Sequence, residues 1–194
     1  KGGVPNEKIV FHGNNKSDKE IDFAIRNNIK IIVDNDYDLK RLEEVSDSLS
    51  HDLEIMIRFT PGIECHTHEY IRTGSFDSKF GFGIEYLKIL FGIIRDTKHL
   101  KLTGIHAHIG SQIFELDPHN DLGEIMVNVI LDAKKFDHNI KEINVGGGLG
   151  IKYTKKDDPP SIDEWVKTIS NSVVKACKKN NLDFPILMCE PGRS

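Results

Sequence analysis

Short β-rich runs and amphipathic helical patterns alternate along this chain from end to end. The runs that favour strands lie at 9–12, 31–33, 54–60, 103–107, 143–145 and 186–189. Helical patterns separate them at 17–28, 36–49, 86–94, 123–135 and 161–179, and a long polar loop spans 63–82. Such alternation predicts a parallel sheet whose strands are joined by right-handed helical crossovers.

Counting the repeating units favours a closed barrel over an open sheet. A (β/α)8 TIM-type barrel has eight strand–helix units and typically about 250 residues. The 194 residues here fit about one domain and supply about six of those eight units. We therefore expect residues 1–194 to form barrel strands three to eight, with the first two strands absent. A doubly wound open sheet is the alternative, although no Gly-x-Gly-x-x-Gly turn follows the first strand.

Composition argues against several classes of partner. The net charge is −4 and the basic residues are scattered, so no nucleic-acid partner is expected. No apolar stretch approaches the roughly 20 residues that span a bilayer, so no membrane partner is expected either. The three cysteines form no even, regularly spaced set. Their number argues against a disulfide framework and indicates a reducing, cytoplasmic location.

Three of the predicted strands end in short polar motifs that contain glycine. They lead into His108-Ile109-Gly110-Ser111, Gly146-Gly147-Gly148 and Glu190-Pro191-Gly192-Arg193. α/β proteins place their active sites at the carboxyl ends of parallel strands. The three ends together offer a flat ring, backbone amides, a hydroxyl, a carboxylate and a guanidinium. This set is suited to a phosphorylated aromatic cofactor with a protonatable ring.

Each motif has a possible role and a plainer alternative. The glycines at 146–150 let backbone amides approach a phosphate, or they form only a flexible turn. Glu190 can pair with a ring nitrogen and keep it protonated, and Arg193 can hold a phosphate or a carboxylate. Alternatively, the two make a surface ion pair. Arg58 is expected to face inward, toward a cofactor or Glu190, or to form an ion pair at the edge of the barrel.

A metal site is the competing interpretation. His106 and His108 lie two apart on a strand and so point to one face, as the His-x-His ligands of zinc-dependent barrel hydrolases do. No third ligand at another strand end clearly completes the set, so no metal is expected. The Cys65-His66-Thr67-His68 segment lies in the long polar loop, where a lid is favoured over a zinc knuckle because no CxxC partner exists. Lys16 is expected at a helix start or at the pocket rim.

With these motifs in view, the sequence resembles the barrel domain of the diaminopimelate decarboxylases, which belong to the alanine-racemase-like (fold type III) pyridoxal-phosphate enzymes. The resemblance runs end to end in the expected order, through residues 11–17, 67–74, 78–81, 108–112, 146–150 and 190–194. His-Ile-Gly-Ser, the triple glycine and Glu-Pro-Gly-Arg are typical of the wider superfamily. The Thr-His-Glu-Tyr and Ser-Lys-Phe-Gly motifs favour the diaminopimelate branch over ornithine and arginine decarboxylases.

The resemblance implies a pyridoxal 5'-phosphate cofactor and a role for each motif residue. His108 would stack on the pyridine ring and Glu190 would pair with its protonated nitrogen, which makes these two the catalytic residues of this chain. Arg193 would also bind a substrate carboxylate. The residues implied to bind the cofactor are His108, Ser111, Gly147, Gly148, Glu190, Gly192, Arg193 and Arg58.

The resemblance also implies what the full-length protein does. It would decarboxylate meso-2,6-diaminopimelate, a small amino acid, to L-lysine and CO2 as a homodimer, in the last step of lysine biosynthesis. The family's cofactor-binding lysine lies on the first barrel strand and its proton-donor cysteine in a C-terminal β-domain. Both are expected outside this sequence, so the chain alone is expected to be inactive. A related ornithine or arginine decarboxylase, a catalytically dead binding homologue and a zinc-dependent barrel hydrolase stay open as alternatives.

Overall fold

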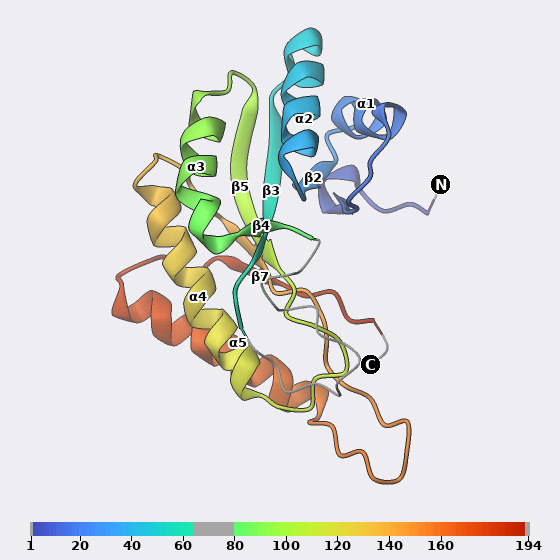
Figure 1. Cartoon of the computed structure of the whole chain (residues 1–194), viewed down its shortest axis with the longest axis vertical. Helices are drawn as coiled ribbons and strands as arrows, with labels where there is room; N and C mark the ends of the chain where they lie inside the picture. Colours follow the sequence, from blue (N-terminus) through green and yellow to red (C-terminus); the bar gives the residue numbers. More distant parts are fainter. Residues whose placement is uncertain (1, 64–79, 193–194) are drawn as a thin grey trace.

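The computed structural model of the chain describes residues 2–63 and 80–192, and Figure 1 shows helices arranged along a central sheet. The strands are β1 (Val10–Phe11), β2 (Lys30–Val33), β3 (Leu53–Thr60), β4 (Phe82–Gly83), β5 (Leu100–Ala107), β6 (Glu142–Asn144) and β7 (Ile186–Met188). The helices are α1 (Asp18–Arg26), α2 (Asp36–Leu49), α3 (Leu87–Asp96), α4 (Asp117–Lys134) and α5 (Ile162–Lys179). None of the helices in the described residues is long and apolar enough to cross a membrane.

The strands form one sheet in the order β1-β2-β3-β5-β6-β7, and each neighbouring pair runs parallel. The parallel α/β arrangement that the alternating patterns predict is therefore confirmed. β4 also pairs in parallel with the end of β3. Sequence patterns do not predict this short strand, because Phe82 and Gly83 stand at the end of a polar loop and only pairing with β3 defines it.

Two helices begin at serine caps, at the positions 17 and 161 where the sequence patterns predict helices to begin. Ser17 accepts a hydrogen bond from the amide of Glu20, and Ser161 accepts one from the amide of Glu164. In each case the glutamate side chain accepts a hydrogen bond from the serine amide in return. These capping boxes satisfy amides that have no partner inside the helix, and so fix where α1 and α5 start.

α4 begins at Asp117, before the position expected from the sequence, which was Gly123. Pro118 occupies its first turn, where the missing amide hydrogen costs nothing. A glycine inside a helix normally weakens it, so sequence patterns place Gly123 at the boundary. In the structure a Cβ on Gly123 would lie 2.5 Å from Oγ of Ser172 in α5. Close packing of α4 against α5 therefore explains this glycine.

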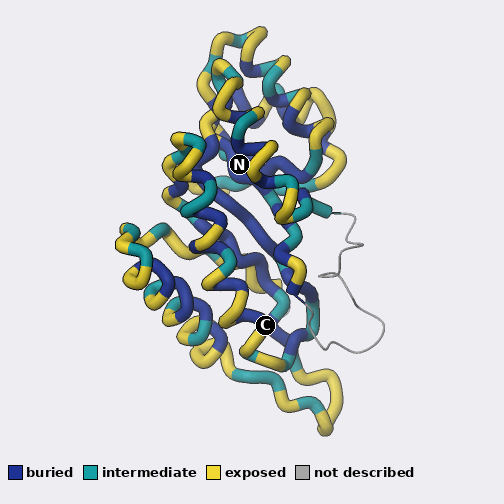
Figure 2. Tube along the Cα trace, turned by 60° about the vertical axis from the view of Figure 1, so that its left-hand side comes forward, coloured by how far each residue is buried: buried dark blue, intermediate teal, exposed yellow. Residues whose placement is uncertain are grey.

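The two faces of the sheet carry different kinds of side chain. One face buries apolar side chains such as Ile55 and Ile105, which join the apolar sides of the helices in one hydrophobic core. Figure 2 shows this buried layer as dark blue segments through the middle of the molecule. On the other face, Lys30 of β2 forms ion pairs with Glu54 of β3 and Glu142 of β6. That polar face continues to the carboxyl ends of the strands.

β3 and β5 slip against each other by one residue within their pairing. Up to Ile55 the two strands pair residue for residue, but the partner of Met56 is Gly104, so Thr103 is an extra residue in β5. A bulge of this kind reverses the alternation of side chains in one strand relative to its partner. Gly104 allows the close approach, because a Cβ there would lie 2.7 Å from the Met56 side chain. The bulge thus decides which side chains of β5 share a face with those of β3.

Candidate active site

The pairing register places polar residues of neighbouring strands side by side near the carboxyl edge of the sheet. Arg58 of β3 lies opposite His106 of β5, and His106 lies opposite Asn144 of β6. Paired residues of parallel strands point to the same face. Glu190 follows two residues after Met188, the partner of Asn144, and so extends the same row. The fold thereby gathers residues from four separate parts of the sequence.

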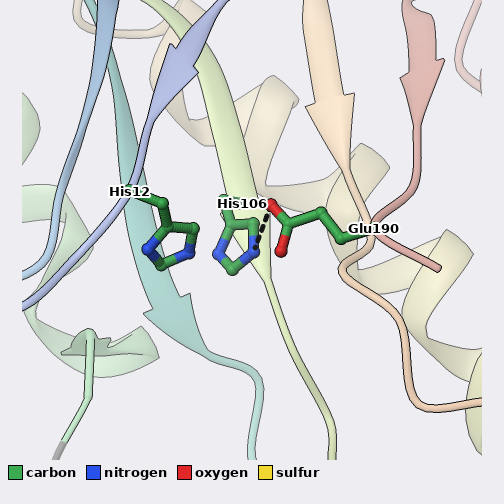
Figure 3. A group of neighbouring side chains, drawn as sticks. All are labelled: His12, His106 and Glu190. Atoms are coloured by element: carbon green, nitrogen blue, oxygen red, sulfur yellow. Dashed lines mark ion pairs between the residues drawn. The ribbon is translucent and has the colours of Figure 1, made fainter. Parts of the chain in front are cut away.

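The Glu190 carboxylate is held from two sides. Its Oε1 accepts a hydrogen bond from Nδ2 of Asn144 at 2.9 Å and lies 3.5 Å from Nε2 of His106. His12, directly after β1, meets the His106 ring edge-on, with the ring centroids 4.7 Å apart. Figure 3 shows His12, His106 and Glu190 converging from different strands. The carboxylate is therefore oriented although 42% of its side chain is exposed.

The surroundings lower the pKa of this carboxylate and of two nearby imidazoles, those of His12 and His108. His106, whose Nε2 lies 3.5 Å from the carboxylate, is the main cause that lowers the pKa of Glu190 to about 2. Burial, and after it the charge of His106, lowers the pKa of His12 to about 4. Burial also lowers the pKa of His108, and the charge of Arg58 acts in the same direction. At neutral pH the site presents an anionic acceptor beside the uncharged rings of His12 and His108.

His12, His106 and Glu190 could also hold a metal ion. One ligand atom from each lies within 4.8 Å of those of the other two. Two imidazoles and a carboxylate form the protein ligand set of some catalytic zinc sites. His12 is the third ligand that sequence patterns miss, because only the sheet brings it beside His106. The predicted pairing of His106 with His108 is not part of this group.

His108 lies just beyond β5, against the glycine loop that follows β6. Its Nδ1 accepts a hydrogen bond from the amide of Gly147 at 3.3 Å. Gly146 has a φ of +67° and Gly148 a φ of +107°, values that residues with a Cβ rarely adopt. A Cβ on Gly146 would lie 2.7 Å from Nδ1 of His108, and one on Gly148 would overlap the carbonyl oxygen of Gly110. The triple glycine is therefore required by the local geometry and is more than a flexible turn.

The loops after β5 and β6 are tied to each other. Ile113 and Leu149 form an isolated parallel bridge. The side-chain amide of Gln112 donates to the carbonyl of Ile151 at 3.1 Å and accepts from its amide at 3.0 Å. Ser111 stands directly before Gln112 and is half-buried. The hydroxyl and the glycine amides predicted to bind a phosphate therefore belong to two loops that brace each other.

Arg58 reaches the site, but its ion-pair partner is Asp34. Nη1 of Arg58 lies 3.3 Å from Oδ1 of Asp34, a residue that directly follows β2 and is 2% exposed. The guanidinium also lies over the ring of Phe80, 4.8 Å from its centroid. The sequence suggests several partners for Arg58. Of these, the structure supports an ion pair at the sheet edge and not a contact with Glu190.

Lys16 lies at a helix start, as one of its two expected positions has it, directly before Ser17, the cap of α1, but it is buried and so does not lie at a pocket rim. Its ammonium donates to the carbonyl oxygen of Gly13 and forms an ion pair with Asp38 at 2.6 Å, and only 5% of the residue is exposed. The Asp38 carboxylate also accepts a hydrogen bond from the backbone amide of Asp34 at 3.2 Å. Pairing explains the burial, because a buried charge needs an opposite charge and further hydrogen bonds. Asp38 lies in the first turn of α2, beyond α1 and β2, so spacing along the chain does not reveal the pair.

The structure does not bring Gly192 against the other predicted site residues. Gly192 is exposed, and a Cβ there would meet no atom within 4 Å. Arg193 and the predicted lid segment at 65–68 lie outside the described residues. The roles assigned to these positions stay predictions.

Comparison with known proteins places the chain in a family. The family described as "Pyridoxal-dependent decarboxylase, pyridoxal binding domain" matches residues 1–194. The chain belongs to this family. Diaminopimelate decarboxylase from Synechocystis sp. is 52% identical over 188 residues, which are 97% of this chain and 40% of the relative. The enzyme of the same name from Bacillus subtilis is 38% identical over 206 residues, covering 99% and 45%.

A solved structure with the same fold supports the assignment to the pyridoxal-dependent decarboxylases. The crystal structure of diaminopimelate decarboxylase from Helicobacter pylori complexed with L-lysine matches with a TM-score of 0.87 and 29% identity. The match covers 98% of this chain and 47% of that chain. The predicted fold class, a partial alanine-racemase-like α/β barrel with about six strands, is confirmed. The chain spans less than half the length of these relatives.

The described residues fit the pyridoxal group after which the family's domain is named. Glu190 offers an ionised acceptor for a protonated ring nitrogen. His108 offers a neutral ring, and the loop after β6 consists of glycines, which have no side chain to keep a phosphate away from the backbone. A Cβ on Gly147 would overlap the carbonyl oxygen of Glu190, so a side chain here would disturb the acceptor itself. The donors and acceptors thus match the parts of a phosphorylated pyridine.

Proposed function

We propose that the full-length protein is a pyridoxal 5'-phosphate-dependent decarboxylase. It converts meso-2,6-diaminopimelate to L-lysine and CO2, the last step of lysine biosynthesis. The observation that carries the proposal is the Glu190 carboxylate, kept ionised by His106 and Asn144 at the carboxyl edge of the sheet. Relatives that match nearly the whole chain are named diaminopimelate decarboxylase, which favours this substrate over ornithine and arginine.

The residues of this chain have separate tasks in that reaction. Bound pyridoxal phosphate supplies an electron sink for the electron pair left when the substrate loses CO2. Glu190 accepts a hydrogen bond from the ring nitrogen and keeps the proton on that nitrogen, because a carboxylate with a pKa of about 2 stays ionised at neutral pH. His108 stacks on the ring face as a neutral imidazole. Ser111 and Gly148 bind the phosphate, and Gly147 supports the cofactor site through the hydrogen bond from its amide to His108.

Three more residues complete the proposed site. Arg58 contributes positive charge near the ring from its place in the row with His106. The backbone of Gly192 and Arg193 joins the phosphate site. The Arg193 side chain binds a substrate carboxylate, since a guanidinium pairs with a carboxylate through two parallel hydrogen bonds.

We also propose that the chain supplies strands three to eight of an eight-stranded barrel. β1 and β7 are the two ends of the strand order, so two further strands between them would close the sheet. The lysine that binds the cofactor covalently belongs to the first of those strands, and the proton-donor cysteine belongs to a C-terminal β-domain. Residues 1–194 alone therefore do not turn over substrate.

The proposed setting is a homodimer in the cytoplasm. The family resemblance implies the dimer, with each site completed across the interface. Cys177 and Cys189 are free thiols, which supports a reducing compartment. Sedimentation of the full-length protein tests the dimer, and a monomer that is fully active would contradict it.

A side-by-side assay of the full-length protein tests the function. With pyridoxal phosphate present, meso-diaminopimelate should yield L-lysine and CO2 with a kcat/KM at least about 100-fold above that for ornithine or arginine. Glu190→Gln should lose most of this activity, while Glu124→Gln on the exposed side of α4 serves as the matched control. Turnover of ornithine or arginine alone would refute the substrate. Failure to bind the cofactor would refute the class.

The His12, His106 and Glu190 group favours one other candidate, a zinc-dependent hydrolase. Metal analysis of the full-length protein distinguishes the two. Stoichiometric zinc without the absorbance of bound cofactor would overturn the decarboxylase proposal. A catalytically dead homologue would instead bind the cofactor and turn over nothing, and its flanking sequence would lack the lysine or the cysteine.

A further inference from the structure

Both polar atoms of the Asn144 side chain form hydrogen bonds. It is the last residue of β6 and is 2% exposed. Its Nδ2 donates to Oε1 of Glu190 at 2.9 Å, and its Oδ1 accepts from the amide of Gly146 at 2.9 Å. We propose that Asn144 is a positioning residue that couples the acceptor for the cofactor ring to the loop for the cofactor phosphate. The inference rests on the proposed function and adds a residue that none of the predicted site positions includes.

Only an amide can make these two contacts at once. A carboxylate has acceptors only, so aspartate at this position would keep the contact with Gly146 and repel Glu190. A leucine of similar size would make neither contact. The backbone adds a second tie, because the amide of Glu190 donates to the carbonyl oxygen of Gly146 at 2.7 Å. Glu190 and Gly146 are thus joined twice, once directly and once through Asn144.

The link matters because its two ends recognise different parts of one ligand. Glu190 orients the ring through its nitrogen, and the loop that begins at Gly146 binds the phosphate. Movement of either partner changes the hydrogen bond that Asn144 makes with the other. Occupation of the phosphate site and recognition of the ring nitrogen should therefore favour each other, and coupling between two sites is reciprocal.

Three substitutions in the full-length protein separate the two contacts. Asn144→Asp removes the donor to Glu190 and keeps the acceptor for Gly146. Asn144→Leu removes both contacts. Asn171→Asp, at an exposed position of α5, makes the same change in charge away from the site and is the matched control.

The readouts are the dissociation constants of pyridoxal phosphate and of inorganic phosphate, and the absorbance of the bound cofactor across pH, which reports the protonation of its ring. Asn144→Asp should weaken pyridoxal phosphate binding about 10- to 100-fold, the effect of losing a hydrogen bond to a charged group. In Asn144→Leu, which removes the contact with Glu190 without adding charge, the ring should lose its proton at lower pH than in the unmodified protein. Inorganic phosphate should bind Asn144→Asp within about twofold of the unmodified protein, and Asn144→Leu more weakly.

Repeating the substitution in a Glu190→Gln variant shows whether Asn144 acts through Glu190. In Glu190→Gln the new amide can donate to aspartate, so adding Asn144→Asp should change cofactor affinity by less than about threefold. An equal loss in both backgrounds would contradict the inference. Unchanged cofactor affinity in Asn144→Asp would also contradict it, and so would unchanged ring protonation in Asn144→Leu. If Asn144→Asp does not fold, Asn144→Ser removes the reach to Glu190 without adding charge and should show the same loss. An unmodified protein that binds no pyridoxal phosphate would refute the proposed function instead.

Discussion

Replacing Gly146 by alanine should disrupt the loop after β6 by the addition of one methyl group. The φ of +67° at this position costs a residue with a Cβ about 1–2 kcal/mol. The methyl would also stand 2.7 Å from Nδ1 of His108 and 2.9 Å from the carbonyl oxygen of Ala107, closer than carbon atoms pack in folded proteins. Relieving such overlap costs about 1–3 kcal/mol, so the total penalty is about 2–5 kcal/mol.

This penalty should be visible as lost stability in urea unfolding of the cofactor-free full-length protein, or as weaker binding of pyridoxal phosphate. As an affinity change it corresponds to at least about 30-fold. Gly92→Ala in α3 is the matched control, because its Cβ would lie 3.9 Å from the Phe136 ring in ordinary contact. That change should stabilise the protein by about 0.5–1 kcal/mol. If Gly146→Ala matched the unmodified protein in both measurements, contact with His108 would not be what requires glycine.

Three further predictions concern the core and the helix ends. His119 is fully buried against the Trp165 ring, and burial lowers its pKa from 6.5 to about 4. The unfolded chain therefore binds more protons between pH 6.5 and 4, and stability falls as pH falls through that range. His119→Phe should abolish about 2 kcal/mol of this loss at pH 5 in urea unfolding, and an unchanged pH profile would contradict the cause. Arg58→Met should cost about 3–5 kcal/mol by leaving the Asp34 carboxylate buried and unpaired, and a double variant with Asp34→Asn that recovers no stability would refute this reason. Ser161→Ala should cost about 1 kcal/mol in thermal or urea unfolding by removing the cap of α5, whereas Ser161→Asp should cost little.

The ends of the strands carry most of what the sequence predicts about the site. His108, the triple glycine and Glu190 each follow an apolar run directly, and parallel strands bring such ends to one edge of the sheet. Local signals of this kind also place the serine caps of α1 and α5. These features depend on neighbours within a few residues, which a single sequence displays.

The partners of the site residues depend on contacts between distant segments. Asn144 looks like an ordinary polar residue at a strand end, and only its two hydrogen bonds reveal its place. His12 joins His106 only because β1 and β5 belong to one sheet. The burial of Lys16 depends on Asp38, which lies in α2, 22 residues further along the chain. Pairings of this type need the register of the folded sheet and leave no periodic pattern in the sequence.

The extra residue in β5, Thr103, reverses which of the side chains after it face the site. In an unbroken strand paired with β3 from Ile55 onward, Ile105 would face the site and His106 would point into the apolar core. The shift at Thr103 exchanges these two, and a Cβ at Gly104 would lie 2.7 Å from the Met56 side chain on the paired strand. The bulge at Thr103 therefore determines that His106, and not Ile105, lies on the face that carries Glu190. A side chain added at Gly104 would change the site chemistry without touching any residue that performs it.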